Sequence, residues 1–211
     1  MAGTSYKTSK RATDVASLPD HEIMARLKSA PREQVVAGFE VLVRRYKNAI
    51  VSFTYRYVGD YRAAEDLAQD AFVRVFRKIQ EYDPTAKFST WLYTIAGNLA
   101  KDELKRRARH PAQSLDWKSG DGADTTRNVP TASDGTPTPD ASLERTETRD
   151  RVTIALAKLD VDDREIITLK DVQGLSYDDI SRILSLPLGT VKSRISRARM
   201  AFKDIWKTMG A

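Results

Sequence analysis

Residues 175–202, LSYDDISRILSLPLGTVKSRISRARMAF, have the pattern of two short helices joined by a tight turn. Ser176 stands at the cap position of the first helix, where its hydroxyl can accept a hydrogen bond from a backbone N–H. An apolar stripe at helical spacing follows, formed by Ile180, Ile183 and Leu184. Residues 185–189 interrupt this spacing, and Pro187 stands where it can begin the next helix. The segment therefore predicts a helix-turn-helix, and other parts of the chain must supply the core behind it.

The second helix of this unit separates an apolar side from a basic side. At about 100° per residue, its packed side consists of Val191, Ile195, Ala198 and Phe202. The opposite side and its shoulders carry Lys192, Ser193, Arg194, Ser196 and Arg197. From Leu188 to Lys207 there are six basic side chains and a single acidic one, Asp204. Such a helix fits a DNA major groove, where Lys and Arg meet phosphates or guanine edges. The alternative is an ordinary amphipathic helix with a solvated charged face.

The composition favours a polyanionic partner and excludes several kinds of chemistry. The 211 residues carry a formal charge of +6, and the pI is near 9.5. The absence of Cys removes disulfides, thiolate zinc sites and Cys nucleophiles. With only His21 and His110, no glycine-rich phosphate loop and no clustered metal ligands, we expect no enzyme activity, no cofactor and no metal. Without a signal peptide or a membrane-spanning run, we expect a soluble, cytoplasmic protein with no membrane insertion.

The N-terminal half of the chain predicts a bundle of helices after a disordered leader over residues 1–18. A short helix is expected over residues 20–29, and Pro31 opens a longer one that ends at Gly59 and Asp60. Whether this longer helix is continuous across residues 48–52 is left open by the pattern.

Residues 61–80 form the most segregated amphipathic helix of this half. The stripe opposite its apolar face contains Asp66, Gln69, Asp70, Val73 and Arg77. A solvated polar face is one interpretation of this stripe. The other is a docking surface for a basic protein partner, because Val73 stands among acids and an amide.

The loop at residues 81–89 and the helix that follows it predict a second nucleic-acid contact. Tyr82 and Phe88 bracket the loop, which contains Lys87, and the helix over residues 90–108 carries Asn98 and Lys101. The helix ends on a basic cluster of Lys105, Arg106, Arg107 and Arg109. These residues could receive an unstacked base and its backbone. Alternatively, the rings belong to the core and the cations complement the helix dipole.

The composition changes to Pro, Gly, Ser, Thr and Asp over residues 110–141, which predicts a flexible acidic linker. Helical spacing resumes over residues 143–159, and a short helix is expected over residues 163–171. The predicted fold is therefore all-α, with two small helical domains at residues 19–109 and 142–207, the second of which contains the helix-turn-helix.

Three stretches in this order resemble the extracytoplasmic-function (ECF) sigma factors of the sigma-70 family, the small two-domain initiation subunits of bacterial RNA polymerase. They are AFVRVFRKI preceded by AEDLAQD, then KFSTWLYTIAGNLAKDELKRR, and finally DVQGLSYDDISRILSLPLGTVKSRISRARMAF. The resemblance covers residues 18–108 and 143–207.

The resemblance implies a role for each candidate surface. The stripe of Asp66, Gln69, Asp70, Val73 and Arg77 would dock on the clamp helices of the largest subunit of core RNA polymerase. The −10 element would meet Tyr82, Lys87, Phe88, Asn98, Lys101, Lys105 and Arg106, and the −35 element would meet Lys192, Ser193, Arg194, Ser196 and Arg197. The implied partners are core polymerase with its clamp helices and flap, promoter DNA and an anti-sigma factor. The linker would thread through the polymerase.

Other classes of function remain as alternatives to a sigma factor. A stand-alone transcriptional regulator would bind duplex DNA without polymerase, although that class usually needs a dimer to hold two half-sites. A scaffold whose basic helices bind acidic proteins would show no sequence preference on DNA. An enzyme is the least favoured class, for the reasons of composition given above.

Overall fold

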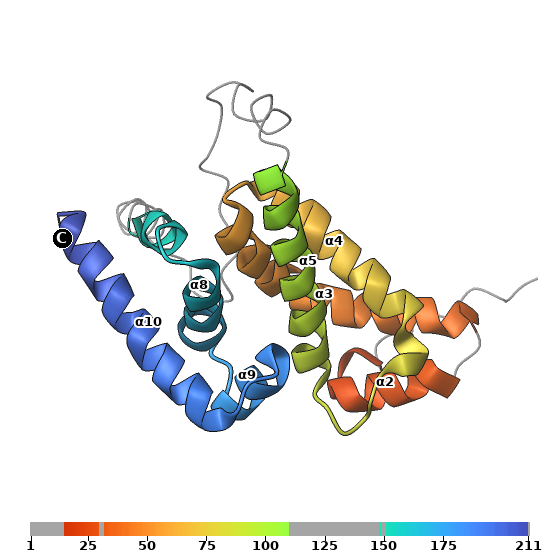
Figure 1. Ribbon diagram of the computed structural model, residues 1–211. Helices are drawn as coiled ribbons and strands as arrows, with labels where there is room; N and C mark the ends of the chain where they lie inside the picture. The colour runs from red at the N-terminus through yellow and green to blue at the C-terminus, as the bar shows by residue number, and fades with distance from the viewer. Residues whose placement is uncertain (1–14, 30–31, 110–147, 149–150, 211) are drawn as a thin grey trace, which may run out of the picture.

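The computed structural model describes residues 15–29, 32–109, 148 and 151–210, and the regular elements in these ranges are all helical (Figure 1). The predicted all-α fold is therefore confirmed. The N-terminal elements are α2 (Asp20–Ser29), α3 (Arg32–Val58), α4 (Tyr61–Arg77), the 3-10 turn η1 (Ile79–Glu81) and α5 (Phe88–Arg109). The C-terminal elements are α8 (Val161–Ile167), the π-helical turn η2 (Thr168–Val172), α9 (Tyr177–Leu184) and α10 (Leu188–Thr208), and residues 151–157 are also helical. The predicted linker lies outside the described residues.

Helix α3 is continuous across residues 48–52, which settles the question that the pattern left open. It ends because Gly59 adopts a left-handed conformation with φ of +67°, and Asp60 then caps α4 by accepting a hydrogen bond from the Ala63 N–H at 2.6 Å. The buried Thr54 hydroxyl lies 2.9 Å from the carbonyl oxygens of Ile50 and Ala64. This contact ties α3 to α4.

The predicted apolar face of α4 is the centre of the N-terminal core. Its buried residues are Ala63, Ala64, Leu67, Ala68, Ala71, Phe72 and Val75. Phe39 of α3 packs edge-on against Phe72 and Phe76, with ring centroids 6.3 and 5.2 Å away. Helix α5 also packs on α4 and α3, so that one face of α5 is committed to this core.

Residues 15–18, which the sequence assigned to a disordered leader, pack against this domain. Val15 and Leu18 contact the core, and the Arg45 guanidinium donates to the carbonyl oxygens of Ala16 and Leu18 at 2.8 and 2.7 Å. A segment without helical periodicity is thus held by hydrogen bonds from a distant side chain. Residues 1–14 of the predicted leader lie outside the described residues.

A buried arginine on α8 joins this helix to the chain that precedes it in the C-terminal domain. Asp160 caps this helix by accepting from the Asp163 N–H at 2.9 Å. Arg164 is 8% exposed, and its guanidinium donates to the carbonyl oxygens of Leu156, Ala157 and Leu159 at 2.7–3.0 Å. A fourth bond reaches Tyr57 of α3 at 3.1 Å. The planar guanidinium thus closes the helix that precedes α8 and also contacts the N-terminal domain.

The short helix predicted over residues 163–171 starts two residues earlier and changes type along its length. After α8 the chain continues as the π turn η2, in which the Gln173 N–H donates to the Thr168 carbonyl at 2.9 Å. Gly174, with φ of +69°, then ends it. The spacing of apolar residues cannot reveal the change from an α-helix to a π turn, because the buried residues of the segment stay on the same side in both.

The predicted helix-turn-helix is formed by α9, residues 185–187 and α10. The Ser176 hydroxyl accepts from the Asp179 N–H at 3.1 Å and so caps α9 as expected. The chain reverses at Ser185, which is left-handed with φ of +52°, and the Leu186 N–H donates back to the Ser181 carbonyl at 3.0 Å. Pro187 directly precedes the first residue of α10.

Candidate nucleic-acid interface

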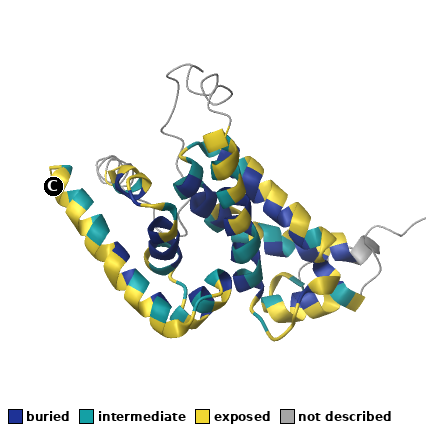
Figure 2. Ribbon diagram, in the orientation of Figure 1, coloured by how far each residue is buried: buried dark blue, intermediate teal, exposed yellow. Residues whose placement is uncertain are grey.

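The basic helix α10 presents the face that the sequence predicted. Val191, Ile195 and Ala198 are between 0% and 2% exposed, and they pack this helix against the C-terminal core. On its other sides Lys192, Ser193, Ser196 and Arg197 are exposed and Arg194 is half-buried. The outward side of α10 is exposed along much of its length (Figure 2). The helix can therefore enter a groove without leaving its core.

One shoulder of α10 forms a shallow hollow beside α9. Its volume is about 340 Å³, and it is lined by Tyr177, Lys192, Ile195, Ser196, Arg199, Met200 and Lys203. Three of these side chains are cations, and Met200 is 65% exposed. A hollow with hydroxyl, thioether and cationic walls can meet both a phosphate and an apolar base edge.

Aspartates of α8 and η2 lie beside the arginines of α10. Arg199 makes a two-pronged contact with Asp171, and this hydrogen bonding raises the pKa of the guanidinium. Arg197 and Arg194 lie 3.6 and 3.7 Å from Asp163 and Asp162, respectively. These pairs are long or exposed and are worth little on their own. Arg194 and Arg197 are among the residues that the resemblance assigned to the −35 element, whereas Arg199 is not.

The loop between η1 and α5 has a defined structure. Asp83 accepts from the backbone N–H of Thr85 at 2.9 Å and from its hydroxyl at 2.8 Å, and these bonds lower the pKa of its carboxyl. Lys28 of α2 donates to the Tyr82 carbonyl at 2.9 Å. The loop therefore holds Lys87, which is exposed, in a fixed place beside the start of α5.

Tyr82 and Phe88 are both only 2% exposed, so neither presents a ring face to a base in this conformation. Tyr82 packs on Trp91 with ring centroids 5.3 Å apart, and Phe88 packs on Tyr46 at 5.4 Å. The interpretation that fits this structure is the alternative one, in which the rings belong to the core. Aromatic rings beside a turn signal give the same pattern whether they point outward or inward, so the sequence alone could not decide between the two interpretations.

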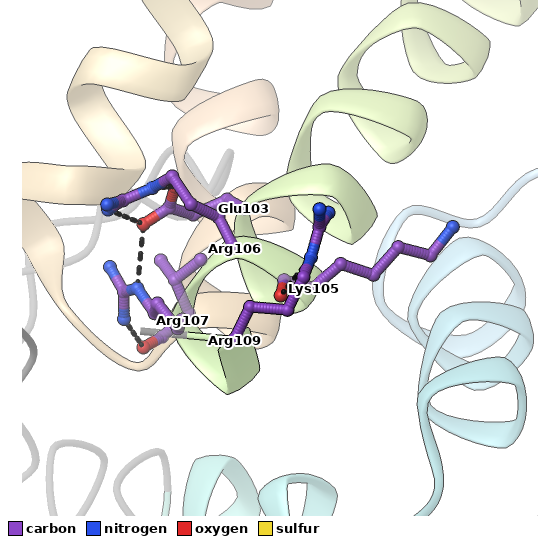
Figure 3. Close-up of polar contacts among 6 residues, drawn as sticks. Glu103, Lys105, Arg106, Arg107 and Arg109 are labelled. Carbon is purple, nitrogen blue, oxygen red and sulfur yellow. Dashed lines mark hydrogen bonds and ion pairs between the residues drawn. The ribbon is translucent and has the colours of Figure 1, made fainter. Parts of the chain in front are cut away.

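The basic end of α5 is organised by one glutamate (Figure 3). Glu103 accepts from Arg106 at 2.7 and 2.9 Å and from Arg107 at 2.8 Å, and these bonds lower the pKa of its carboxyl. Arg107 also donates to the Val58 carbonyl at 3.0 Å, which fixes the end of α5 against the end of α3. Lys105 is exposed and extends away from this cluster (Figure 3).

Two of the predicted −10 cations are paired with carboxylates of the C-terminal domain. The Lys101 ammonium lies 2.5 Å from Glu165 of α8, and the Lys87 ammonium lies 2.8 Å from Asp179 of α9. Asn98, which lies between Lys87 and Lys101 in the sequence, is on α5 and is exposed. Sequence patterns did not reveal these pairs, because their members are 64 and 92 residues apart and lie on separate domains.

The predicted docking stripe of α4 is exposed as a whole. Asp66, Gln69, Asp70, Val73 and Arg77 lie opposite the core face, and Val73 is 45% exposed. A single exposed apolar side chain is common on protein surfaces, so the exposure of Val73 is compatible with a protein contact but does not by itself indicate one.

Within residues 15–29, 32–109, 148 and 151–210, no three His, Asp or Glu side chains gather in a way that could hold a metal ion. No helix in the same ranges is long and apolar enough to span a bilayer.

These features define a class: all-helical proteins that present a helix-turn-helix from one domain and a basic helix from another. Comparison with known families gives two matches in the same order. Residues 42–110 match the model described as Sigma-70 region 2, and residues 149–202 match that described as Sigma-70, region 4.

Individual relatives agree with the family models. The chain is 32% identical over 188 residues to the RNA polymerase sigma-H factor of Pseudomonas aeruginosa, across 86% of this chain and 91% of the relative. It is 38% identical over 168 residues to the ECF RNA polymerase sigma factor SigW of Bacillus subtilis, across 79% and 87%. The sigma factor RpoE of Bartonella quintana, solved with the anti-sigma factor NepR, has a TM-score of 0.59 and 25% identity, with 80% of this chain and 96% of that chain covered. The chain belongs to the ECF sigma factors of the sigma-70 family and directs promoter-specific transcription initiation with core RNA polymerase.

Proposed function

We propose that this sigma factor docks on core polymerase through the stripe of α4, reads the −35 element as duplex DNA with α10, and holds the melted −10 element on α5. The observation that carries the proposal is the geometry of α10. Its buried residues Val191, Ile195 and Ala198 fix the helix in its domain, and its basic residues remain on the outside.

Recognition of the −35 element is assigned to Lys192, Ser193, Arg194, Ser196 and Arg197. The exposed lysine neutralises phosphates, and the serines let the DNA backbone approach closely. Arg197 is 66% exposed, and its long contact with Asp163 can be exchanged for a guanine edge.

Contact with the melted −10 strand is assigned to Lys87, Asn98, Lys101, Lys105 and Arg106. They lie in the loop and along α5, so that a strand running beside the helix meets them in order. Tyr82 and Phe88 support the loop from the core and are not assigned to a base. Opening needs no ATP in this account, because binding to the displaced strand offsets an unstacking cost of a few kcal/mol per base.

Docking on polymerase is assigned to the α4 stripe, with the clamp helices of the largest subunit as the surface it meets. The acids and amide of the stripe suit a basic partner, and Val73 supplies an apolar centre. The polymerase flap is the proposed partner of the C-terminal domain. Catalysis belongs to the polymerase, and the proposed place of action is the cytoplasm. An anti-sigma factor is a further proposed partner, since the matched Bartonella quintana protein is in complex with one.

The deciding experiment is transcription in vitro on a pool of promoter-containing templates. The purified protein is added to bacterial core polymerase, and core alone is the control. Transcripts that appear only with the protein support the proposal, and their start sites give both promoter elements. If the protein binds specific duplex DNA but neither binds core nor starts transcription, the stand-alone regulator replaces the sigma factor.

A further inference from the structure

The C-terminal domain is docked on the same side of α5 that the proposed function assigns to the melted strand. Figure 1 shows α9 beside the beginning of α5, and α8 lies against α3. Buried apolar side chains of both domains belong to one continuous hydrophobic cluster, and polar contacts also join the domains. They include the pairs Lys101–Glu165 and Lys87–Asp179, and the hydroxyl of Tyr93 donates to Gln173 at 2.7 Å.

Both carboxylates of this interface are buried. Glu165 is 3% and Asp179 is 5% exposed, so each has been removed from water and needs a cation nearby. Burial alone would raise the pKa of Asp179, but hydrogen bonds from Lys87 and Ser176 outweigh it and the pKa is lowered. In both pairs the cation comes from the other domain, and in both it is a residue assigned to the −10 strand.

Gly97 makes this close approach possible. A Cβ atom added there would lie 2.9 Å from Oε1 of Glu165, which is too near for an undisturbed contact. Glycine weakens a helix relative to alanine, and Gly97 lies within the 22 residues of α5. The missing side chain therefore leaves the space through which Glu165 reaches Lys101.

We propose that this arrangement is an autoinhibited state, in which Glu165 and Asp179 occupy on Lys101 and Lys87 the places of two phosphates of the −10 strand. This inference rests on the proposed function of α5. The carboxylates and the strand compete for the same two ammonium groups, so the C-terminal domain must leave α5 before the strand can bind. The apparent affinity for the strand is then reduced by the fraction of molecules that are open.

The two variants that open the interface change no residue assigned to DNA. A charge-swapped variant also changes Lys101, and only its radius of gyration is interpreted. Gly97→Ala places a methyl group against Glu165, and Glu165→Lys sets two ammonium groups against each other. Asp178→Lys is the matched control for the second variant, because it makes the same charge change at an exposed position of α9. Each full-length variant is measured by small-angle X-ray scattering and by anisotropy with a fluorescent single-stranded DNA pool of random sequence.

We expect Glu165→Lys, and to a smaller extent Gly97→Ala, to have a larger radius of gyration than the parent chain and to bind the single strands more tightly, because a methyl group at position 97 displaces only the carboxylate end of Glu165. If nine molecules in ten are closed, full opening raises the apparent affinity about tenfold. Asp178→Lys should keep the radius of gyration of the parent chain. Its affinity for single strands should rise less than that of Glu165→Lys, because only the added charge contributes. In the swapped variant Glu165→Lys with Lys101→Glu, the ion pair is restored and the radius should return to the parent value.

Two results would overturn the inference. An unchanged radius of gyration in both opening variants would mean that the docked arrangement does not persist in solution. Opening without any gain in single-strand affinity over Asp178→Lys would mean that docking does not inhibit. Transcription by core polymerase with the parent chain is measured separately. Either of these two results can therefore be obtained while the proposed function stands. Failure of the parent chain to support transcription with core polymerase would instead contradict the proposed function.

Discussion

Single side chains of α10 carry the proposed upstream recognition, and Arg197 is the one best placed to read a base. Arg197→Ala should weaken recognition of the −35 element by about 1–3 kcal/mol, because a bidentate guanine contact is lost. The measurement is footprinting of the complex with polymerase on templates found by transcription. The control is Lys158→Ala, which removes the same charge from an exposed side chain outside α10. An unchanged footprint and promoter preference for Arg197→Ala would remove this residue from the interface.

At the same scale, Asp66 tests the polymerase surface. Asp66→Arg reverses a charge in the exposed stripe of α4, and we expect it to abolish co-migration with core polymerase on a native gel. Its far-UV circular dichroism should be unchanged, since the side chain lies outside the core. Glu22→Arg makes the same charge change on α2 and should leave co-migration intact. Retained binding by Asp66→Arg would contradict the docking assignment.

The exposure of the candidate residues was predictable from the sequence only where it follows from helical periodicity. The basic side of α10 and the stripe of α4 are exposed as expected, because one apolar face fixes the orientation of the whole helix. Tyr82 and Phe88 stand at the edge of a loop, where no such periodicity operates. Their burial depends on Trp91 and Tyr46, whose positions only the packed structure gives.

Among the elements, the boundary between α3 and α4 depends on one capping aspartate. Asp60→Ala removes the acceptor of the Ala63 N–H and should lower the free energy of unfolding by about 1 kcal/mol. Urea denaturation followed by circular dichroism measures this change. Asp60→Asn keeps an oxygen acceptor and should stay close to the parent chain. An equal loss in both variants would show that charge, and not capping, stabilises this end of α4.

The helix order, the continuity of apolar faces and the helix-turn-helix were accessible to sequence reasoning, but the details of helix ends were not uniformly so. Ser176 and Asp60 are recognisable caps because their side chains can accept from the following N–H groups. The π turn η2 has no comparable signal. The left-handed conformation of Ser185 was equally hidden. Glycine is the residue that usually adopts it, but the nearby glycine, Gly189, lies within α10.

For the whole molecule, docking of the domains links stability to pH through Asp179. Its pKa is below the ordinary value of 3.8 in the folded protein, because bonds from Lys87 and Ser176 outweigh the opposing effect of burial. The ionised carboxylate therefore stabilises the fold fully above about pH 4 and loses this effect as the pH falls through the folded pKa.

We therefore expect the loss of stability caused by Asp179→Asn to be largest near neutral pH and to shrink in acid. Urea denaturation of both chains at several values from about pH 6 to about pH 3 would measure the difference. A difference that stayed constant over this range would contradict the assignment of a depressed pKa.

The relation between the two domains is the part of the structure that the sequence could not predict. Lys101 and Glu165 are each ordinary charges within their own helices, and their pairing depends on how two separate folding units meet. Within α5, Gly97 is the local sequence feature connected with this pairing. A single glycine within a helix does not show which segment packs against it.

The hydrogen bonds of Arg164 bear on how the two domains respond to heating. Three of its four hydrogen bonds stay within the C-terminal domain, and only the bond to Tyr57 crosses to α3. Undocking therefore leaves the junction before α8 intact, so the domain can separate without melting. On heating, the two halves should come apart before either loses its helices, and a calorimeter would record more than one cooperative transition from this single chain.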